Sequence, residues 1–433
     1  MQLENGCACC SLSDELATSI QELLDVGEKE GGNSFDRIVI ELSGVADPTA
    51  VIGNFESLIL SNHPLRDKVD LRNPNVVTLV DAGAFGKDWM TWNTAGEREG
   101  WVEDGDACSE SLLITELLAE QVEAADTLVV NKIDMVSGKE MKDCEEMVRG
   151  LNSKARVFTS EFGKAPVIEL LRSKGEEGEV GGGCQDKSCG DPKCETHGDV
   201  VKEDAGGCND PGCGDPNCKT HGEGAGHDHG HSHDHEEVES KDKPQMAGIT
   251  SFTYKASRPF HMDKLLGVLN TWPVPVKDTL DLDLMATYRD QKAKMPDGKE
   301  VSNPFVSILR SKGFCWLAPQ EWNGANGDAW RHDTAMYWSH ASKHFGINQA
   351  GKWWGTLESK DKVREFLKGR EKEAERIFRE DWVGEEFGDR RQELVFIGVN
   401  YDEEDITKAL DDCLFTEDEM DVYRAGVATV MDV

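Results

Sequence analysis

Three cysteines stand within four residues near the start of the chain, at Cys7, Cys9 and Cys10. Thiols this close together are poorly placed to pair with one another, and soft thiolates prefer zinc or copper(I). Three thiolates leave a tetrahedral ion one ligand short, which suits an ion that must be handed on. The cluster therefore predicts an exchangeable metal site. A closed structural zinc site, or cysteines buried as small hydrophobes, are the alternatives.

A second group of metal-ligating side chains forms a duplicated unit followed by a histidine tract. Each unit holds three cysteines and one histidine, a tetrahedral zinc set, and its Gly-Asp-Pro turn folds the ligands together. The tract alternates histidine with Asp, Gly and Ser, which suits loose collection of zinc, nickel or cobalt. The predicted ligands are Cys184, Cys189, Cys194 and His197, then Cys208, Cys213, Cys218 and His221, then His227, His229, His231, His233 and His235. A low-complexity linker is the alternative.

Asn131-Lys132-Ile133-Asp134 directly follows an apolar run that predicts a buried strand. In guanine-nucleotide sites an aspartate at this place accepts two hydrogen bonds from the edge of the base. The asparagine and lysine support the loop and cover the base. Asn131, Lys132 and Asp134 are therefore predicted nucleotide contacts, and a polar loop after a strand is the alternative.

Glu41-Leu42-Ser43-Gly44 leaves the end of another apolar run. The Glu41 carboxylate is suited to hold the water shell of a magnesium ion, and Gly44 allows its amide to approach a γ-phosphate. A helix start, with Asp47 as cap and Pro48 in the first turn, is a compatible alternative. The chain contains no G-x-x-x-x-G-K-[ST], and so lacks this cradle and lysine for the β- and γ-phosphates.

The elements that would position these residues alternate along the first part of the chain. Apolar runs at 37–41, 76–80 and 126–130 predict buried strands, and 14–28 and 110–124 have helical periodicity. This alternation predicts a parallel α/β sheet.

The rest of the chain divides into two regions of different composition. Residues 173–247 have almost no large apolar side chains, and we expect them to be disordered without metal. From residue 248 onward a smaller α+β domain is predicted. Its expected strands are 249–254, 306–309 and 394–399, its helices are 262–269, 362–379 and 405–413, and an acidic, mobile insertion is expected near 275–303.

Composition limits the classes of partner. The 433 residues carry a net charge of −36, which argues against nucleic acid, because phosphate contacts need basic patches. No run of 18 apolar residues is present, so no membrane span is expected. Thirteen cysteines, nine of them in tight clusters, fit metal binding in a reducing compartment. The isolated Cys108, Cys144, Cys315 and Cys413 are expected to be packed or exposed and not to bind metal.

Taken together, the motifs resemble the CobW-type GTPase and metallochaperone family. The N-terminal matches are Gly6 to Cys10, Glu41 to Pro48, Val80-Asp81-Ala82 and Asn131 to Asp134. The C-terminal matches, which resemble the CobW C-terminal domain, are Arg258 to His261, Arg310 to Phe314 and Gly388 to Phe396. The family pattern places a first strand, the phosphate loop and a helix before the cysteine cluster. The chain therefore resembles a member that lacks this N-terminal portion.

The resemblance implies a P-loop-type parallel sheet in residues 1–172, a Cys/His-rich insert in 173–247 and a CobW C-terminal α+β domain in 248–433. It implies GTP-dependent delivery of zinc, or cobalt, to client metalloproteins, with GTP and Mg²⁺ bound by the complete family member. A metal buffer without catalysis and a client-docking module are the alternatives. The cytoplasm is the expected compartment, with the plastid as the alternative.

Overall fold

A computed structural model of the chain describes residues 12–29, 35–60, 64–69, 74–102, 107–171 and 248–431. The last range has short gaps at 273, 275–277, 288–292, 295–299, 302, 323–327 and 358. The described residues belong to one compact unit, which the chain leaves after Ser173 and re-enters at Gln245. Within them, no helix is long and apolar enough to cross a membrane.

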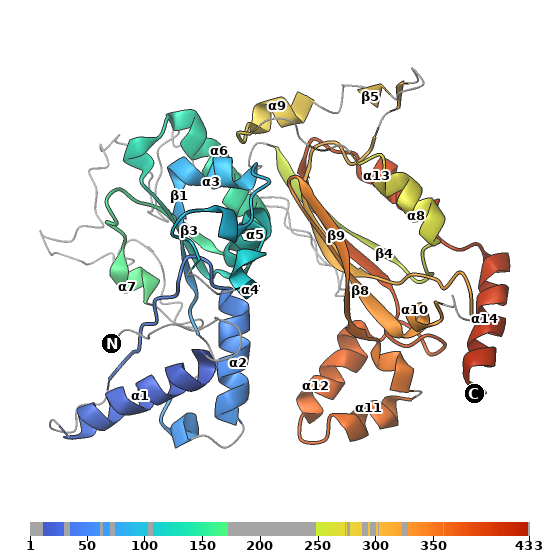
Figure 1. Ribbon diagram of the computed structural model, residues 1–433, viewed down its shortest axis with the longest axis horizontal. Helices are drawn as coiled ribbons and strands as arrows, with labels where there is room; N and C mark the ends of the chain where they lie inside the picture. Colours follow the sequence, from blue (N-terminus) through green and yellow to red (C-terminus); the bar gives the residue numbers. More distant parts are fainter. Residues whose placement is uncertain are drawn as a thin grey trace, which may run out of the picture. The chain divides into compact units, whose positions relative to one another are not determined.

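The first sheet is parallel, with three strands in the order β1-β2-β3 (Figure 1). Asp81 of β1 lies opposite Asn131 of β2, and Val130 of β2 lies opposite Thr159 of β3. The elements are α1 (Leu12–Lys29), α2 (Pro48–Leu60), η1 (Pro64–Asp67), β1 (Val77–Asp81), α3 (Ala82–Trp89), η2 (Ala95–Glu97), α4 (Ala107–Glu110), α5 (Ile114–Ala124), β2 (Thr127–Asn131), η3 (Ile133–Met135), α6 (Gly138–Leu151), β3 (Arg156–Thr159) and α7 (Val167–Leu170). This alternation confirms the predicted parallel α/β architecture.

β2 is the central strand of this sheet, and its apolar run is buried. Leu128 and Val130 pack in one core with Val122 of α5 and Met147 of α6. A continuous apolar run is expected where helices cover both faces of a strand. β1 is covered less well, since Leu79 at its centre is 68% exposed. β1 and β2 each begin and end one residue later than the apolar runs 76–80 and 126–130 predict.

α1 and α2 pack against each other around a small core of their own. Leu16 and Ile20 of α1 meet Val51 and Phe55 of α2, each pair spaced by four residues on one helix face. The helix predicted at 14–28 is thereby confirmed, two residues longer at its start and one at its end.

The strand predicted at residues 37–41 is wrong. The segment has no regular secondary structure, and Val39 and Ile40 are 77% and 43% exposed. Ile38 and Leu42 instead pack on the α1–α2 core. A buried parallel strand needs a ladder partner and helices on both faces. Among the described residues this segment pairs with no strand, although β1 has a partner on one edge only.

The second sheet is antiparallel, with five strands in the order β4-β10-β7-β8-β9 (Figure 1). The elements of this half are β4 (Ile249–Ala256), α8 (Met262–Leu269), α9 (Leu282–Thr287), β5 (Ala293–Lys294), β6 (Glu300–Val301), β7 (Ile308–Cys315), α10 (Trp330–Asp333), β8 (Thr334–Ala341), β9 (His344–Lys352), η5 (Trp354–Leu357), α11 (Lys360–Phe366), α12 (Glu371–Arg376), η6 (Ile377–Asp381), β10 (Gln392–Val399), α13 (Glu403–Asp411) and α14 (Glu417–Met431). This confirms the predicted α+β class of the C-terminal half.

The two faces of the second sheet have different partners. Phe396 of β10 packs with Leu265 of α8 and Leu410 of α13, so these helices cover one face. The next residue, Ile397, shares the core of the first sheet together with Leu309 of β7. Successive strand residues point to opposite faces, which explains how one strand contributes to both cores.

Three predictions for the C-terminal half need correction. The helix predicted at 362–379 is broken into α11, α12 and the π turn η6, because Gly369 between α11 and α12 takes a left-handed φ of 91°. The strand predicted at 306–309 begins at residue 308 and continues to 315. The insertion predicted at 275–303 contains α9, whose Leu282 and Met285 are buried in the core of the first sheet.

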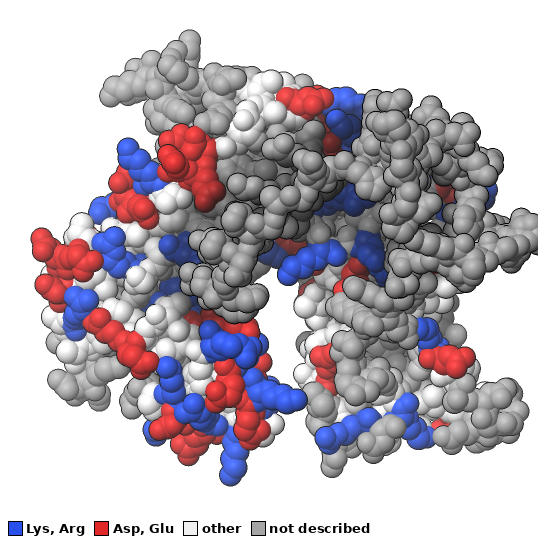
Figure 2. Space-filling model, turned by 180° about the vertical axis from the view of Figure 1, so that it is seen from behind, with Lys and Arg blue, Asp and Glu red and all other residues white. Residues whose placement is uncertain are grey.

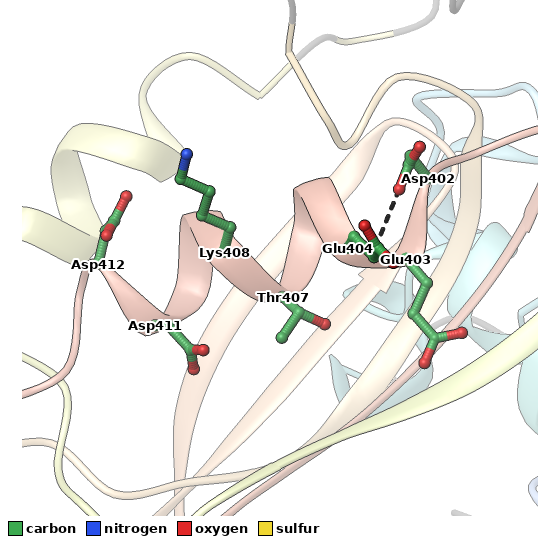
Figure 3. A pocket seen from close by; sticks show the side chains of 7 residues that line it. All are labelled: Asp402, Glu403, Glu404, Thr407, Lys408, Asp411 and Asp412. Carbon is green, nitrogen blue, oxygen red and sulfur yellow. Dashed lines mark hydrogen bonds between the residues drawn. The ribbon is translucent and has the colours of Figure 1, made fainter.

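The described surface mixes both signs of charge, and Figure 2 shows acidic and basic side chains interspersed on one face. α13 begins with an acidic run. Its cap Asp402 accepts hydrogen bonds from the backbone N–H groups of Glu404 and Asp405, at 3.0 and 3.3 Å. Carboxylates in a first turn interact favourably with the helix dipole. Figure 3 shows Asp402, Glu403 and Glu404 among the side chains that line a surface hollow, which includes no residue predicted to bind nucleotide or metal.

Candidate nucleotide and metal sites

The predicted base-binding residues lie at one edge of the first sheet. β1 ends at Asp81, β2 at Asn131 and β3 at Thr159. The three strands are parallel and in register, so their carboxyl ends lie along the same edge. Open parallel sheets bind ligands at this edge, because the loops that leave it converge there.

Lys132 is fixed at this edge by a contact that the sequence did not predict. Its ammonium group pairs with the Asp81 carboxylate at 2.6 Å, and its backbone is left-handed, with a φ of 61°. Asp81 also caps α3 by accepting hydrogen bonds from the N–H groups of Gly83 and Ala84, at 2.9 and 3.2 Å. Burial works to raise the pKa of Asp81, but Lys132 and the two amides hold it below its usual value. Both partners are therefore ionised at neutral pH.

Asn131 joins the loop after β2 to the loop after β3. Its side-chain oxygen accepts a hydrogen bond from the backbone N–H of Gly163 at 3.1 Å. The Ser160 N–H donates to the Val130 carbonyl at 2.8 Å, and the Ile133 N–H donates to the Ser160 carbonyl at 3.4 Å. Asn131 thus supports the loop, as the motif predicts. Gly163 was not predicted, because nothing in its local sequence marks it.

Asp134 lies in η3, a turn closed by the Met135 N–H, which donates to the Lys132 carbonyl at 3.0 Å, and its side chain is exposed. Among the described residues no hydrogen bond or ion pair engages its carboxylate. Two acceptor oxygens are therefore open to solvent, two residues after the lysine that pairs with Asp81. A carboxylate in this state is suited to accept the two N–H groups that guanine presents on one edge.

The Glu41–Gly44 loop has a compact turn but few contacts of its own. The Ala46 N–H donates to the Ser43 carbonyl at 3.0 Å, and the Asp47 carboxylate caps α2 by accepting from the Thr49 N–H at 2.8 Å. The predicted helix start at Asp47 is therefore confirmed. Glu41 is exposed, and a Cβ added to Gly44 would meet no atom within 4 Å. The close approach of a phosphate to Gly44 remains a prediction.

The two predicted halves of the nucleotide site are not joined by any hydrogen bond or ion pair of the described chain. Gln121 binds the Glu41–Gly44 loop, and its own carbonyl accepts a hydrogen bond from Thr78 at 2.9 Å. Thr78 lies three residues before Asp81, which is about 10 Å at the usual strand rise. Residues 37–41 form no strand, so Glu41 is not at a strand end of this sheet, in contrast to the prediction.

The predicted metal ligands all lie outside the described residues. They are Cys7, Cys9 and Cys10, together with the cysteines and histidines between Cys184 and His235. Where the chain is described, no group of three or more His, Cys, Asp or Glu side chains is placed to hold a metal ion.

Three of the four isolated cysteines are packed, which is one of the two predicted alternatives, packed or exposed. Cys144, Cys315 and Cys413 are buried free thiols. Burial raises the pKa of Cys144 and Cys315 to about 12, and that of Cys413 to about 11. Metal ligation and nucleophilic attack need the thiolate, so these residues serve packing. The side chain of Cys108 lies outside the described set.

Comparison with known proteins gives both halves of the chain the same relatives. Residues 1–159 match the family described as CobW/HypB/UreG, nucleotide-binding domain. Residues 298–414 match the family described as Cobalamin synthesis protein cobW C-terminal domain.

Individual relatives agree with these family matches. The chain is 25% identical to Zinc-regulated GTPase metalloprotein activator 1 of Dictyostelium discoideum, over 99% of this chain and 69% of that protein. It is 32% identical to Zinc chaperone CobW of Sinorhizobium sp and 31% identical to Zinc chaperone YjiA of Escherichia coli, each over 40% of this chain. Those alignments span 45% and 44% of the two bacterial proteins, which is less than half of their length.

A solved structure, that of Zn(II)-bound YjiA GTPase from E. coli, is 17% identical with a TM-score of 0.25, covering 92% of this chain and 76% of that one. From the two family matches, the chain therefore carries a CobW/HypB/UreG nucleotide-binding domain in residues 1–159, followed by a CobW C-terminal domain in residues 298–414.

Proposed function

We propose that this protein is a guanine-nucleotide-dependent metallochaperone that delivers zinc to a client metalloprotein in the cytoplasm. The two family matches support this proposal, as do the names of the relatives, which are zinc chaperones and a zinc-regulated GTPase metalloprotein activator. Zinc is the cargo in this reading, and the nucleotide sets when the cargo is held or released. The client is a metalloprotein whose own ligands complete the coordination of the ion during transfer.

The roles divide among three segments, 1–172, 173–247 and 248–433. In the first segment, Asp134 accepts hydrogen bonds from the guanine edge, Lys132 covers the base and Asn131 supports the loop. Glu41 holds the water shell of the magnesium ion, and the backbone amide of Gly44 approaches the γ-phosphate. Cys7, Cys9 and Cys10 hold the cargo as three thiolates with a fourth position open. The insert collects further metal, and the last segment docks the client.

One observation carries the nucleotide part of the proposal. The Lys132 ammonium pairs with Asp81 at 2.6 Å, and the exposed Asp134 follows two residues later in the same loop. A polar loop with no ligand has no need of a left-handed lysine fixed by a helix cap. Here the ion pair holds the lysine at the carboxyl edge of the sheet before a base arrives, and the exposed Asp134 carboxylate is open to accept hydrogen bonds. Such preorganisation favours recognition because little ordering remains to be done on binding.

The test exchanges the hydrogen-bonding pattern that Asp134 presents. A carboxylate accepts two N–H groups from guanine, whereas the amide of Asp134→Asn offers one donor and one acceptor, which matches xanthine better. Equilibrium dialysis at millimolar nucleotide should show GDP preferred over XDP by the unaltered chain, and the reverse preference in Asp134→Asn. Asp361→Asn is the matched control, because the Asp361 side chain is 92% exposed in the other half of the chain. Equal retention of GDP and ADP by the unaltered chain would contradict the proposal.

A metal buffer without catalysis is the second candidate, favoured by the lack of a G-x-x-x-x-G-K-[ST] phosphate loop in the 433 residues. The two candidates differ in whether nucleotide alters metal release. A chaperone changes the rate at which Cys7, Cys9 and Cys10 yield zinc to a chelator when GTP and Mg²⁺ are added. A buffer releases zinc at the same rate with or without nucleotide.

A further inference from the structure

Gln121 of α5 holds the loop that carries Gly44. Its side-chain amide nitrogen donates to the carbonyl of Gly44 at 2.9 Å and to the carbonyl of Ala46 at 3.0 Å. An amide nitrogen has two hydrogens, so both donors of this group are used on one turn. The Ser43 carbonyl is engaged by the Ala46 N–H within the same turn. The carbonyls on both sides of the Gly44 residue are thereby fixed in direction.

The C-terminal part of α5, which contains Gln121, is itself held by neighbouring elements. The Thr78 hydroxyl of β1 donates to the Gln121 carbonyl at 2.9 Å. The side-chain amide of Asn152, at the end of α6, donates to the carbonyls of Val122 and Ala125, each at 2.8 Å. The last carbonyls of a helix have no partner within the helix, so this amide serves as a cap for α5. The C-terminal turn of α5 is thus attached to both β1 and α6.

A different face of α5 contacts the second sheet. Glu116 accepts a hydrogen bond from the Ser339 hydroxyl at 2.8 Å, and Glu123 pairs with Arg310 at 3.1 Å and Lys312 at 2.5 Å. Glu116 and Glu123 are seven residues apart, which places them on one face of the helix. The Arg310 side chain is 1% exposed, so this contact is inside the protein. Gln121 lies about 140° around the helix from Glu116, at 100° per residue.

We propose that Gln121 is a positioning residue for Gly44, and that through α5 it makes the order of the Gly44 loop depend on the contact between Glu123 and the second sheet. The proposal rests on the proposed role of Gly44 toward phosphate, and it adds the element that sets the direction of the loop. α5 acts as a rigid connector, with the loop bound on one side and Arg310 and Lys312 bound on another. A client that displaces Arg310 and Lys312 then also displaces the Gly44 loop through α5, and a nucleotide that displaces the loop acts on the second sheet in the same way.

The first experiment measures hydrogen–deuterium exchange of the Val45 and Ala46 amides in the full chain. In Gln121→Glu the carboxylate keeps the shape but donates nothing to the two carbonyls. We expect exchange in the loop to be about five- to thirty-fold faster, the effect of losing hydrogen bonds of ordinary strength. Gln349→Glu, the same change on the exposed strand β9, should leave the loop unchanged. Unchanged exchange in Gln121→Glu overturns the positioning role.

The second experiment tests the connection through the helix. Glu123→Gln and the milder Lys312→Met should each speed exchange of the loop in the unaltered background, and have no further effect when Gln121→Glu is present. The same increase in both backgrounds, or no increase in either, overturns the coupling. Protection of the β2 amides Val129 and Val130 must persist in every variant, which separates a local effect from global unfolding. Neither measurement requires nucleotide or metal, so their outcome is independent of whether the proposed function holds.

Discussion

The contact between Glu123 and Arg310 should be one of the strongest single contributions to the joining of the two sheets. One carboxylate oxygen of Glu123 meets the Arg310 Nε at 3.1 Å, and the other meets the Lys312 Nζ at 2.5 Å. The perturbation is Glu123→Ala, which removes both contacts without altering either cation. Lys312→Ala is the comparison, because the Lys312 side chain is 35% exposed and that of Arg310 only 1%.

The magnitude depends on what each variant leaves behind. Without Glu123 the Arg310 guanidinium stays buried, with neutral partners at the Ser339 hydroxyl and the His340 carbonyl, 3.1 and 3.3 Å away. Removing one member of a buried ion pair costs about 3–5 kcal/mol, and the neutral partners place the expected loss of unfolding free energy at about 3 kcal/mol. Lys312→Ala removes a partly solvated pair and should cost about 1 kcal/mol or less.

The assay is urea unfolding followed by tryptophan fluorescence and circular dichroism, because Trp316 and Trp338 are fully buried in the second half of the chain. Coincident transitions by the two probes are required before free energies are compared. In an Arg310→Met background, Glu123→Ala should cost only about 1 kcal/mol or less, since no buried cation is left without its partner. Equal costs of Glu123→Ala in both backgrounds, or a cost no larger than that of Lys312→Ala, would refute the reasoning.

Four further predictions concern activity, metal and pH. The 433-residue chain should bind guanine nucleotide weakly and show no measurable GTP turnover, because it lacks the phosphate loop; magnesium-dependent turnover that Asp134→Ala abolishes would contradict this. A peptide of residues 180–236 should gain defined structure around both repeats and bind two zinc ions tightly, since binding drives folding in such sites. Equal metal uptake after all six repeat cysteines become serine would exclude the assigned ligands. With residues 175–245 deleted, one zinc should remain on Cys7, Cys9 and Cys10, pass readily to a chelator and bind less well as pH falls. Cys9→Ser should abolish this binding but keep the fold, and collapse of the fold would instead mean a structural site. Burial, aided by Arg390 and Arg310, lowers the pKa of His332 and His340 to about 3. The stability due to their neutral forms is complete above pH 6.5 and is lost as pH falls toward 3; His340→Phe should flatten this dependence, and an unchanged slope of unfolding midpoint against pH would contradict the assignment.

The sequence alone determined the features that depend on neighbouring residues. The helix at 14–28 and the strands that became β1 and β2 were evident from periodicity, because burial on one face or on both leaves its pattern in consecutive side chains. The place of Asn131 to Asp134 after a strand followed from the same pattern. The two cysteine and histidine units are evident from the spacing of their residues, and their role as metal ligands stays a prediction.

Tertiary structure decided the partners of those residues. Asp81 lies 51 residues before Lys132, and Glu123 lies 187 residues before Arg310, so neither pair leaves a trace in local sequence. The segment 37–41 has the composition of a buried strand and yet is exposed at Val39 and Ile40, because a strand also needs a neighbour in the sheet. Side-chain pattern reports how a segment prefers to be buried, whereas the register of strands and the packing of helices determine which distant groups meet.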